Sequence, residues 1–351
     1  ELNVWNFVNN NLYYNTNIQE IKENNSENYY KNIALMLEES VKKRTMTTHR
    51  PVACLLSGGL DSSLIAALVK KQYVGTLETY SIGLEGSEDL KYAQKVADHI
   101  GSKHTNIIVS EDDFFNAIPN VIDDIESYDT TTVRASVGNW LIGKYIKEHS
   151  EAKVIFNGDG ADELMGGYLY FNKAPNCYEF DRECKRLLKD IYLYDVLRSD
   201  KSISSHGLEP RTPFLDVEFV QCYLSIPCEL RFHMNLNKCE KFLIRESINK
   251  YFQNLLPDEI LWRKKEAFSD GVSSKSRSWF EIAQEKIDNL NFKSSIKNIY
   301  THNKPQTTEQ LYYRYLFELN YKNTGYIVPY FWMPKYIESH DASARTLSIY
   351  N

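Results

Sequence analysis

The chain has 351 residues, enough to bury the core of one large domain or of two. Hydrophobic residues make up 42% and charged residues 25%, which is typical of a globular protein that dissolves in water. The formal net charge is −6 and no long basic run is present, so nucleic acid is not expected as a partner.

Cysteine usage and hydropathy further limit the class of protein. The six cysteines contain no C-x-x-C pair, so the sequence predicts neither a zinc site nor a disulfide framework. No apolar run reaches the roughly 18 residues that span a bilayer, and no signal peptide is visible. We therefore expect reduced thiols, a cytoplasmic location and no membrane partner.

The N-terminal region, residues 1–28, is rich in Asn, Tyr and Glu and lacks periodicity. It is typical of a linker or of the tail of an upstream domain. Because the chain begins with Glu1 rather than Met, we expect an N-terminal piece to be missing. From Tyr29, the spacing of Ile33, Leu37 and Val41 predicts an amphipathic helix.

A strand–helix rhythm follows and predicts an α/β fold, with a parallel sheet covered by helices on both faces. We expect strands at 52–56, 78–83, 105–109 and 154–156, and helices at 60–71, 90–100, 111–126 and 135–148, with Gly101 ending the second of these helices. From residue 177 the pattern is mostly helical. We predict a nucleotide-binding α/β part at 29–176 and a helical part at 177–351.

The stretch Ser57-Gly58-Gly59-Leu60-Asp61-Ser62-Ser63 joins the first strand to its helix. Such a turn directs free backbone N–H groups and the positive end of a helix toward one point, which suits an anion. It is not a Walker A loop, because the Gly-Lys-Ser/Thr ending is absent. An ordinary tight turn is the alternative, but Asp61 favours a phosphate site with Mg²⁺.

Ligands of parallel sheets bind beyond the carboxyl ends of the strands. This rule brings Leu55, Ile82 and the 157–162 segment to the same edge as the 57–63 loop. Asp61 and Asp162 are then the candidates to hold Mg²⁺. Taken alone, Asp162 is more typical of a helix N-cap, and its pairing with Asp61 favours the metal.

Seven further motifs lie along the chain in one consistent order. They are TTVRAS at 131–136, GDGADEL at 158–164, GGYLYFNKAP at 166–175, RTPFLD at 211–216, LWRKKEAFSDG at 261–271, YYR at 312–314 and DASARTL at 341–347. Together with SGGLDSS they resemble the C-terminal synthetase domain of the asparagine synthetase family, an ATP pyrophosphatase fold, from about residue 26 onward.

The resemblance implies a ligase that makes asparagine from aspartate through β-aspartyl-AMP, with ATP and Mg²⁺ as cofactors. Its implied ATP-binding residues are Leu55, Ser57, Gly58, Gly59, Asp61, Ser62, Ser63, Ile82, Asn157 and Gly158, with Asp61 and Asp162 as metal ligands. Ammonia is the implied nitrogen donor, or glutamine if an upstream glutaminase domain exists. Because Cys54 is the first cysteine and lies in a predicted buried strand, we expect these 351 residues alone to use ammonia. A homodimer is one possible assembly.

Three residues have more specific implied roles. Lys265 matches the family lysine that faces the phosphates, although a basic triplet is otherwise typical of a solvated surface. Arg134 is a candidate to clamp an aspartate carboxylate in two-pronged fashion, with a surface arginine as the alternative. Asp159 stands where eukaryotic members commonly have glutamate, and either serves catalysis or is a structural turn aspartate.

Two other functions remain open. One is a different ATP-pyrophosphatase amidotransferase or a β-lactam-forming relative; the other is a non-catalytic nucleotide-binding module. The presence of Asp61, Asp162 and Lys265 disfavours the module. The acidic balance and the lack of paired cysteines oppose a tRNA-modifying member.

Overall fold

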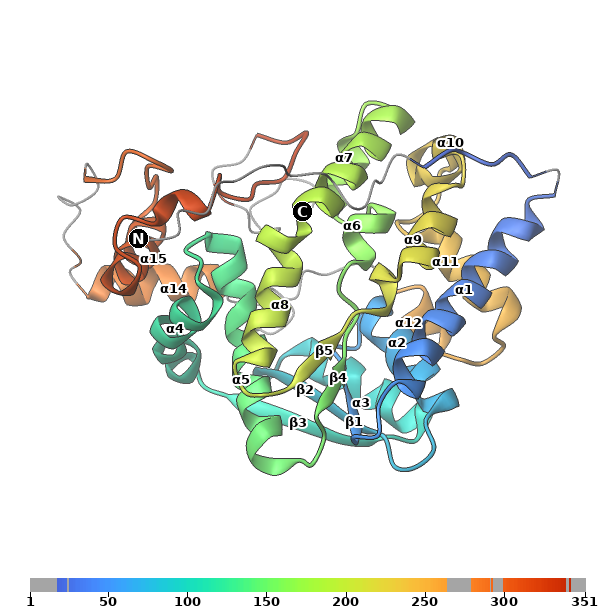
Figure 1. The fold of residues 1–351 in the computed structure, drawn as a ribbon, viewed down its shortest axis with the longest axis horizontal. Helices are drawn as coiled ribbons and strands as arrows, with labels where there is room; N and C mark the ends of the chain where they lie inside the picture. The colour runs from blue at the N-terminus through green and yellow to red at the C-terminus, as the bar shows by residue number, and fades with distance from the viewer. Residues whose placement is uncertain are drawn as a thin grey trace, which may run out of the picture.

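The computed structural model describes residues 18–23, 25–263, 279–290, 292, 299–338 and 341. A five-stranded sheet lies at its centre, with helices on either side (Figure 1). The strands are β1 (Val52–Leu55), β2 (Glu78–Leu84), β3 (Lys103–Val109), β4 (Val154–Phe156) and β5 (Glu209–Arg211). Every pairing is parallel, in the order β3-β2-β1-β4-β5. The predicted α/β fold with a parallel sheet is confirmed.

The first half of the chain supplies one helix before β1, the helices between β1 and β4, and a short helix after β4. They are α1 (Glu27–Met46), α2 (Leu60–Gln72), α3 (Glu88–Ile100), α4 (Glu111–Ile125), α5 (Thr130–His149) and the short α6 (Ala161–Met165). As predicted, α3 ends at Gly101, whose φ of 64° provides the left-handed cap. α5 starts five residues before the predicted 135, because the Asp129 side chain accepts the Thr132 N–H and caps the helix there.

The second half is mainly helical, as predicted. Its longer helices are α7 (Cys177–Asp190), α8 (Asp195–Ser204), α9 (Val217–Leu224), α11 (Phe242–Tyr251), α14 (Trp279–Asn289) and α15 (Thr308–Asn320). Shorter turns are η1 (Leu169–Lys173), η2 (Ile191–Leu193), η3 (Pro213–Leu215), α10 (Cys228–Arg231), η4 (His233–Leu236), α12 (Asp258–Leu261) and η6 (Gly325–Ile327). No described helix combines the length and apolar character needed to cross a bilayer.

Alternate side chains of the strands enter two different hydrophobic cores. In β1, Val52 and Cys54 pack with α1 and α2 on one face, while Ala53 packs with α4 and α5 on the other. The central strand β1 is therefore buried on both sides, as its unbroken apolar sequence predicts. The edge strands β3 and β5 are partly exposed. Figure 1 shows α1 and α2 to one side of the sheet and α4, α5 and α8 to the other.

The core beside α1 joins the two parts predicted at 29–176 and 177–351. Its residues come from α1 and α2 but also from α9 and α11, among them Phe219 and Ile248. The strand β5, which follows α8, completes the sheet by pairing with β4. One hydrophobic core thus contains residues from both sides of residue 176. The division of the chain into two parts at this residue stays a prediction.

The strand order reverses between β1 and β4, because β2 and β3 lie on one side of β1 and β5 lies beyond β4. Ligands of open parallel sheets bind at such a switch point, outside the carboxyl ends of the strands. The loops after β1 and β4 flank this point. They are the 57–59 and 157–160 segments.

Candidate active site

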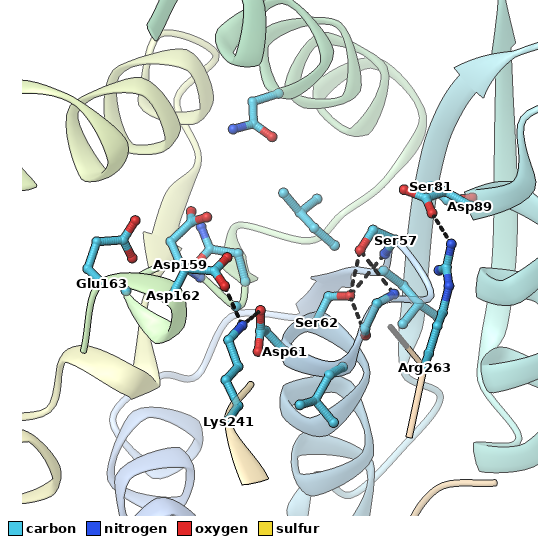
Figure 2. Close-up of a pocket in the computed structure, with 18 of the residues that line it drawn as sticks. Ser57, Asp61, Ser62, Ser81, Asp89, Asp159, Asp162, Glu163, Lys241 and Arg263 are labelled. Carbon is cyan, nitrogen blue, oxygen red and sulfur yellow. Dashed lines mark hydrogen bonds and ion pairs between the residues drawn. The ribbon is translucent and has the colours of Figure 1, made fainter. Parts of the chain in front are cut away.

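A cavity opens at this switch point and contains about 1190 Å³ of space, including its open mouth. Its walls come from the ends of β1, β2 and β4, the starts of α2, α6 and α11, the middle of α5, and from α8. Figure 2 shows Lys241 with a group of carboxylates on one side, Arg263 with Asp89 on the other, and two serines between them.

The loop after β1 is held in shape by its own serines. Ser57 Oγ lies 2.9 Å from Ser62 Oγ, and it also accepts the Gly59 N–H at 3.3 Å. Gly59 is the N-cap of α2, and no side chain caps this end of the helix. The first N–H groups of α2 therefore remain available for an anion in the cavity.

Glycine is required where this loop meets its neighbours. Gly58 has φ +72°, and a Cβ there would lie 2.5 Å from the Ala93 nitrogen on α3. A Cβ on Gly158 would lie 2.7 Å from the Ser62 nitrogen. The loop after β1 thus approaches α3 and the loop after β4 approaches the first turn of α2, because glycine lets these backbones come close together.

Lys241 joins two carboxylates from the helices that follow these two loops, α2 and α6. Its Nζ lies 2.6 Å from Asp61 Oδ2 and 2.5 Å from Asp162 Oδ1. The lysine side chain is only 1% exposed, and its residue caps the start of α11. Asp61 Oδ1 is buried and has no hydrogen-bond partner among the described residues. Both predicted metal ligands therefore converge on one point in the cavity.

A second acidic group lines the wall formed by α6 and α8. Asp159 lies 3.5 Å from an Arg198 guanidinium nitrogen, and Arg198 also pairs with Asp195 at 3.4 Å. Tyr168 donates a hydrogen bond to Glu163. Burial raises the pKa of Asp159, although the Arg198 charge opposes the shift. Burial and the nearby charges of Asp195 and Asp162 raise the pKa of Glu163 well above its usual range.

The opposite wall carries a fixed cation. Arg263 donates to the Gly58 carbonyl at 3.0 Å and to Asp89 Oδ1 at 2.9 Å, and its guanidinium lies 3.9 Å from the centre of the Tyr92 ring. It therefore ties the segment after α12 to the loop after β1. Arg245, which pairs with Glu240 at 2.6 Å, also donates to the Arg263 carbonyl at 3.1 Å.

The structure brings most of the predicted site residues to the cavity. Those lining it are Leu55, Ser57, Gly59, Asp61, Ser62, Ile82, Asn157, Gly158, Asp159 and Asp162. Gly58 and Ser63 do not line it: the Gly58 carbonyl accepts from the lining residue Arg263, and Ser63 is fully buried. Lys265 falls outside the described residues, so its predicted position facing the phosphates stays a prediction.

Arg134 does not lie where the sequence analysis expected it. It is 5% exposed and does not line the cavity. Its guanidinium donates to Glu309 at 2.8 Å and to Asp341 at 2.7 Å and 2.9 Å. Two internal carboxylates thus take the two-pronged contacts that we had expected for aspartate, and the arginine ties α5 to α15.

Sequence reasoning missed several side chains of the cavity. Lys241, Arg198, Glu163, Tyr168 and Arg263 all line it. Lys241 lies 180 positions from Asp61 in the chain, and no motif around it marks a phosphate or metal site. Glu163 and Tyr168 belong to two of the recognised motifs, GDGADEL and GGYLYFNKAP. Their closeness to Asp162 in the sequence was the signal that could have identified them.

Comparison with known proteins places this geometry in a family. The family model described as asparagine synthase matches residues 32–180 and 177–318. The chain belongs to the asparagine synthase family. It is 48% identical over 328 residues to asparagine synthetase [glutamine-hydrolyzing] of Gallus gallus, and 47% identical over 327 residues to the Homo sapiens protein of the same name.

The match to these asparagine synthase relatives covers 91% of this chain but 57% of each relative, so the chain spans little more than half of their length. Among solved structures, NAD+ synthetase from Burkholderia pseudomallei aligns with 63% of this chain and 86% of its own. That alignment has 14% identity and a TM-score of 0.31.

Proposed function

We propose that the chain synthesises asparagine by adenylating aspartate with ATP. The observation that carries this proposal is the convergence of the α2 N-terminus, Asp61 and Asp162 at one cavity in a chain of the asparagine synthase family. In the first step, a side-chain carboxylate oxygen of aspartate attacks the α-phosphorus of ATP. The bond from that phosphorus to the bridging oxygen breaks, and pyrophosphate leaves with β-aspartyl-AMP remaining.

The protein's own groups suit the binding of a triphosphate. The open N–H groups of α2 and the hydroxyls of Ser57 and Ser62 offer donors to phosphate oxygens, while Leu55 and Ile82 supply apolar walls near the nucleotide. Asn157 Nδ2 is buried without a hydrogen-bond partner among the described residues, so it is free to donate to the nucleotide. Holding ATP rigidly beside aspartate lowers the entropy cost of reaction.

The carboxylates Asp61 and Asp162 fit Mg²⁺. They converge on one point, and Asp61 keeps a buried oxygen unpaired among the described residues. Mg²⁺ is commonly held by one or two carboxylates together with substrate phosphates. When bound, it neutralises charge on the phosphates. Lys241 supplies the compensating positive charge within the chain itself, and Lys265 is proposed to face the leaving pyrophosphate.

In the second step, the ammonia nitrogen attacks the acyl carbon of β-aspartyl-AMP, a proton is lost, and AMP leaves. Asp159 lines the cavity with a raised pKa, which makes its carboxylate a better proton acceptor near neutral pH. We propose ammonia as the donor for this chain, drawn from glutamine where a glutaminase part is present. A cytoplasmic location and a homodimer remain predictions.

The test incubates the chain with ATP, Mg²⁺ and ammonium, together with each member of a panel of amino acids. Among the amino acids of the panel, we expect only aspartate to give pyrophosphate release, with asparagine as the product. Asp61→Asn and Asp162→Asn should abolish pyrophosphate release with an unchanged circular dichroism spectrum. Asp98→Asn, which alters an exposed carboxylate on α3, is the matched control and should keep full turnover.

Other outcomes would identify the alternatives. Pyrophosphate release with a different acid would indicate another amidotransferase or a β-lactam-forming relative. No pyrophosphate with any acid, despite ATP binding, would indicate a non-catalytic nucleotide-binding module. Full turnover in both aspartate variants would overturn the metal assignment.

A further inference from the structure

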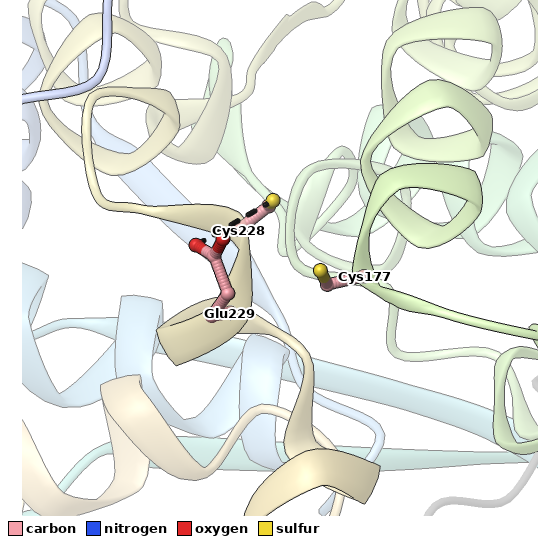
Figure 3. Close-up of side chains that lie close together, drawn as sticks. All are labelled: Cys177, Cys228 and Glu229. Carbon is pink, nitrogen blue, oxygen red and sulfur yellow. Dashed lines mark hydrogen bonds between the residues drawn. The ribbon is translucent and has the colours of Figure 1, made fainter.

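Two cysteines and a glutamate meet at a point where two helices of the second half begin. Cys177 is the first residue of α7, and Cys228 and Glu229 are the first two residues of α10. Both cysteines are free thiols, and the two Sγ atoms and one Glu229 carboxylate oxygen all lie within 4.8 Å of one another. Figure 3 shows Cys177 on one helix facing Cys228 and Glu229 on the other.

The spacing of these atoms agrees with shared coordination of one metal ion. Cys228 Sγ lies 3.8 Å from Glu229 Oε2. Sulfur and oxygen ligands of a tetrahedral zinc ion, at their usual bond lengths, are about 3.6 Å apart, and two sulfur ligands are about 3.8 Å apart. Small rotations of these side chains would therefore close the site around zinc.

The surroundings of the three ligands also suit a bound cation. The thiols are nearly buried, at 7% exposure for Cys177 and 2% for Cys228, whereas Glu229 is exposed and keeps an entry path open. Glu20 is a further carboxylate at the site, because its Oε1 accepts the Cys228 N–H at 2.9 Å. Thiolates and carboxylates together form a donor set that zinc accepts.

We propose that Cys177, Cys228 and Glu229 form a zinc site, with Glu20 or water as the fourth ligand. The site lies apart from the ATP cavity and is independent of the proposed function. The sequence pattern did not predict it, because the two cysteines are 51 positions apart rather than in a C-x-x-C pair. Zinc at this point clamps the start of α7 to α10.

The clamp acts on the hydrophobic cluster that both helices share. Cys177 and Cys228 belong to the same cluster as Phe180, Phe232 and Trp332. Zinc would therefore hold α7 against the segment after α9 and stabilise this part of the fold, since metal binding to the folded chain alone favours folding.

The experiment uses the full chain, stripped of metal with a chelator under reducing conditions and titrated with Zn²⁺ or Co²⁺. We expect one tightly held zinc per chain after dialysis, and a rise in the melting temperature. Cobalt should give the near-ultraviolet sulfur-to-metal charge-transfer band that requires thiolate ligands. Carboxylate sites such as Asp61 with Asp162 do not produce this band, so the two sites are distinguishable.

Matched variants identify the ligands. Cys177→Ser and Cys228→Ser should each lose the retained zinc, while Cys239→Ser, at an exposed cysteine, should keep it. Glu229→Gln changes an exposed side chain, so its fold is not at risk, and it should weaken zinc binding about tenfold or more. Glu259→Gln, another exposed glutamate, is its control.

Three results would overturn the proposal. The first is the absence of both retained zinc and the charge-transfer band in the wild-type chain. The second is unchanged zinc binding in the folded Glu229→Gln variant together with unchanged binding in Cys228→Ser. The third is a Cys177–Cys228 disulfide in the native chain, seen as the loss of two titratable thiols without metal.

Discussion

At the scale of single residues, Lys241 lies between two carboxylates at the starts of two different helices. It touches Asp61 on α2 and Asp162 on α6, and these side chains are 16% and 14% exposed. Without a cation between them, two like charges would face each other in a partly desolvated site. The lysine therefore stabilises the site before any ligand binds.

Replacing Lys241 with Met should lower the free energy of unfolding by about 3 to 5 kcal/mol, because the paired charges lose their buried partner. Added Mg²⁺ should restore part of this loss, since it supplies positive charge to the same carboxylates. Urea denaturation with and without Mg²⁺ measures both effects. Lys42→Met is the control: Lys42 pairs with Glu39 at the surface, and we expect a loss of less than about 1 kcal/mol. Equal losses in the two variants would contradict this assignment.

For Asp159, an experiment can tell whether the side chain serves the adenylation step or the ammonia step. Asp159→Ala should reduce asparagine synthesis at least about tenfold, equivalent to about 1.4 kcal/mol in the barrier. Pyrophosphate release, measured in parallel, should fall as well if Asp159 supports the adenylate, and should persist if it serves the ammonia step. Asp200→Ala, at an exposed position on α8, is the control. A normal rate of asparagine synthesis in Asp159→Ala would mean that Asp159 is a structural turn residue with no catalytic role.

Single residues differ in how well sequence identifies them. Asp61, Asp159 and Asp162 lie within a few residues of glycines that follow apolar strands, so their shared edge could be predicted from local pattern. The partners Lys241 and Arg198 could not, because only tertiary packing brings them to the cavity. Arg134 shows the converse, since its motif did not reveal that Glu309 and Asp341 would engage it.

At the scale of elements, the loop after β1 depends on the conformation of Gly58. A Cβ at this position would meet the α3 backbone. Gly86 offers a matched comparison, because its φ is +82° but nothing lies within 4 Å of an added Cβ. Both glycines thus have a left-handed backbone conformation, but only Gly58 lies against another segment, the α3 backbone.

Gly86→Ala should cost about 1 to 2 kcal/mol of stability through its left-handed backbone alone. Gly58→Ala adds the clash with α3, so we expect a larger loss and at least a tenfold rise in the KM for ATP. Thermal melts and steady-state kinetics provide the two measurements. If Gly58→Ala behaved like Gly86→Ala in both, the contact with α3 would not constrain the loop.

Elements with strong local signals were predicted well, and those fixed by distant partners were not. The strands β1 and β4 read as apolar runs, and α3 ends at its glycine as expected. β5 was missed because its three residues, Glu-Pro-Arg, have no apolar run or alternation. It is a strand only because β4 offers it an edge with which to pair.

At the scale of the whole molecule, Asp129 ties distant parts of the chain together. It caps α5 through Thr132 and also accepts the Trp332 N–H at 2.8 Å, so it links the sheet layer to the C-terminal segment. Burial raises the pKa of this carboxyl from 3.8 to about 6. The folded chain therefore holds a proton there that the unfolded chain releases at lower pH.

Stability contributed by this proton should be lost as the pH rises from about 4 to about 6. The measured quantity is the free energy of unfolding of the wild type minus that of Asp129→Asn. This difference should fall by up to about 3 kcal/mol over that pH range. Urea denaturation at several pH values measures this difference, and other titrating groups cancel in the subtraction. A difference that is flat or rises with pH would contradict the raised pKa.

The packing of α1 also affects how the chain can fold while it is being synthesised. The buried face of α1 includes Ile33, Leu37 and Val41, and its core partners include residues of α9 and α11. On the ribosome, the part of this apolar face that α9 and α11 cover stays exposed until the chain has been extended beyond residue 251. A nascent chain of that kind exposes a ready target for chaperones, and for aggregation if translation stalls between α2 and α9.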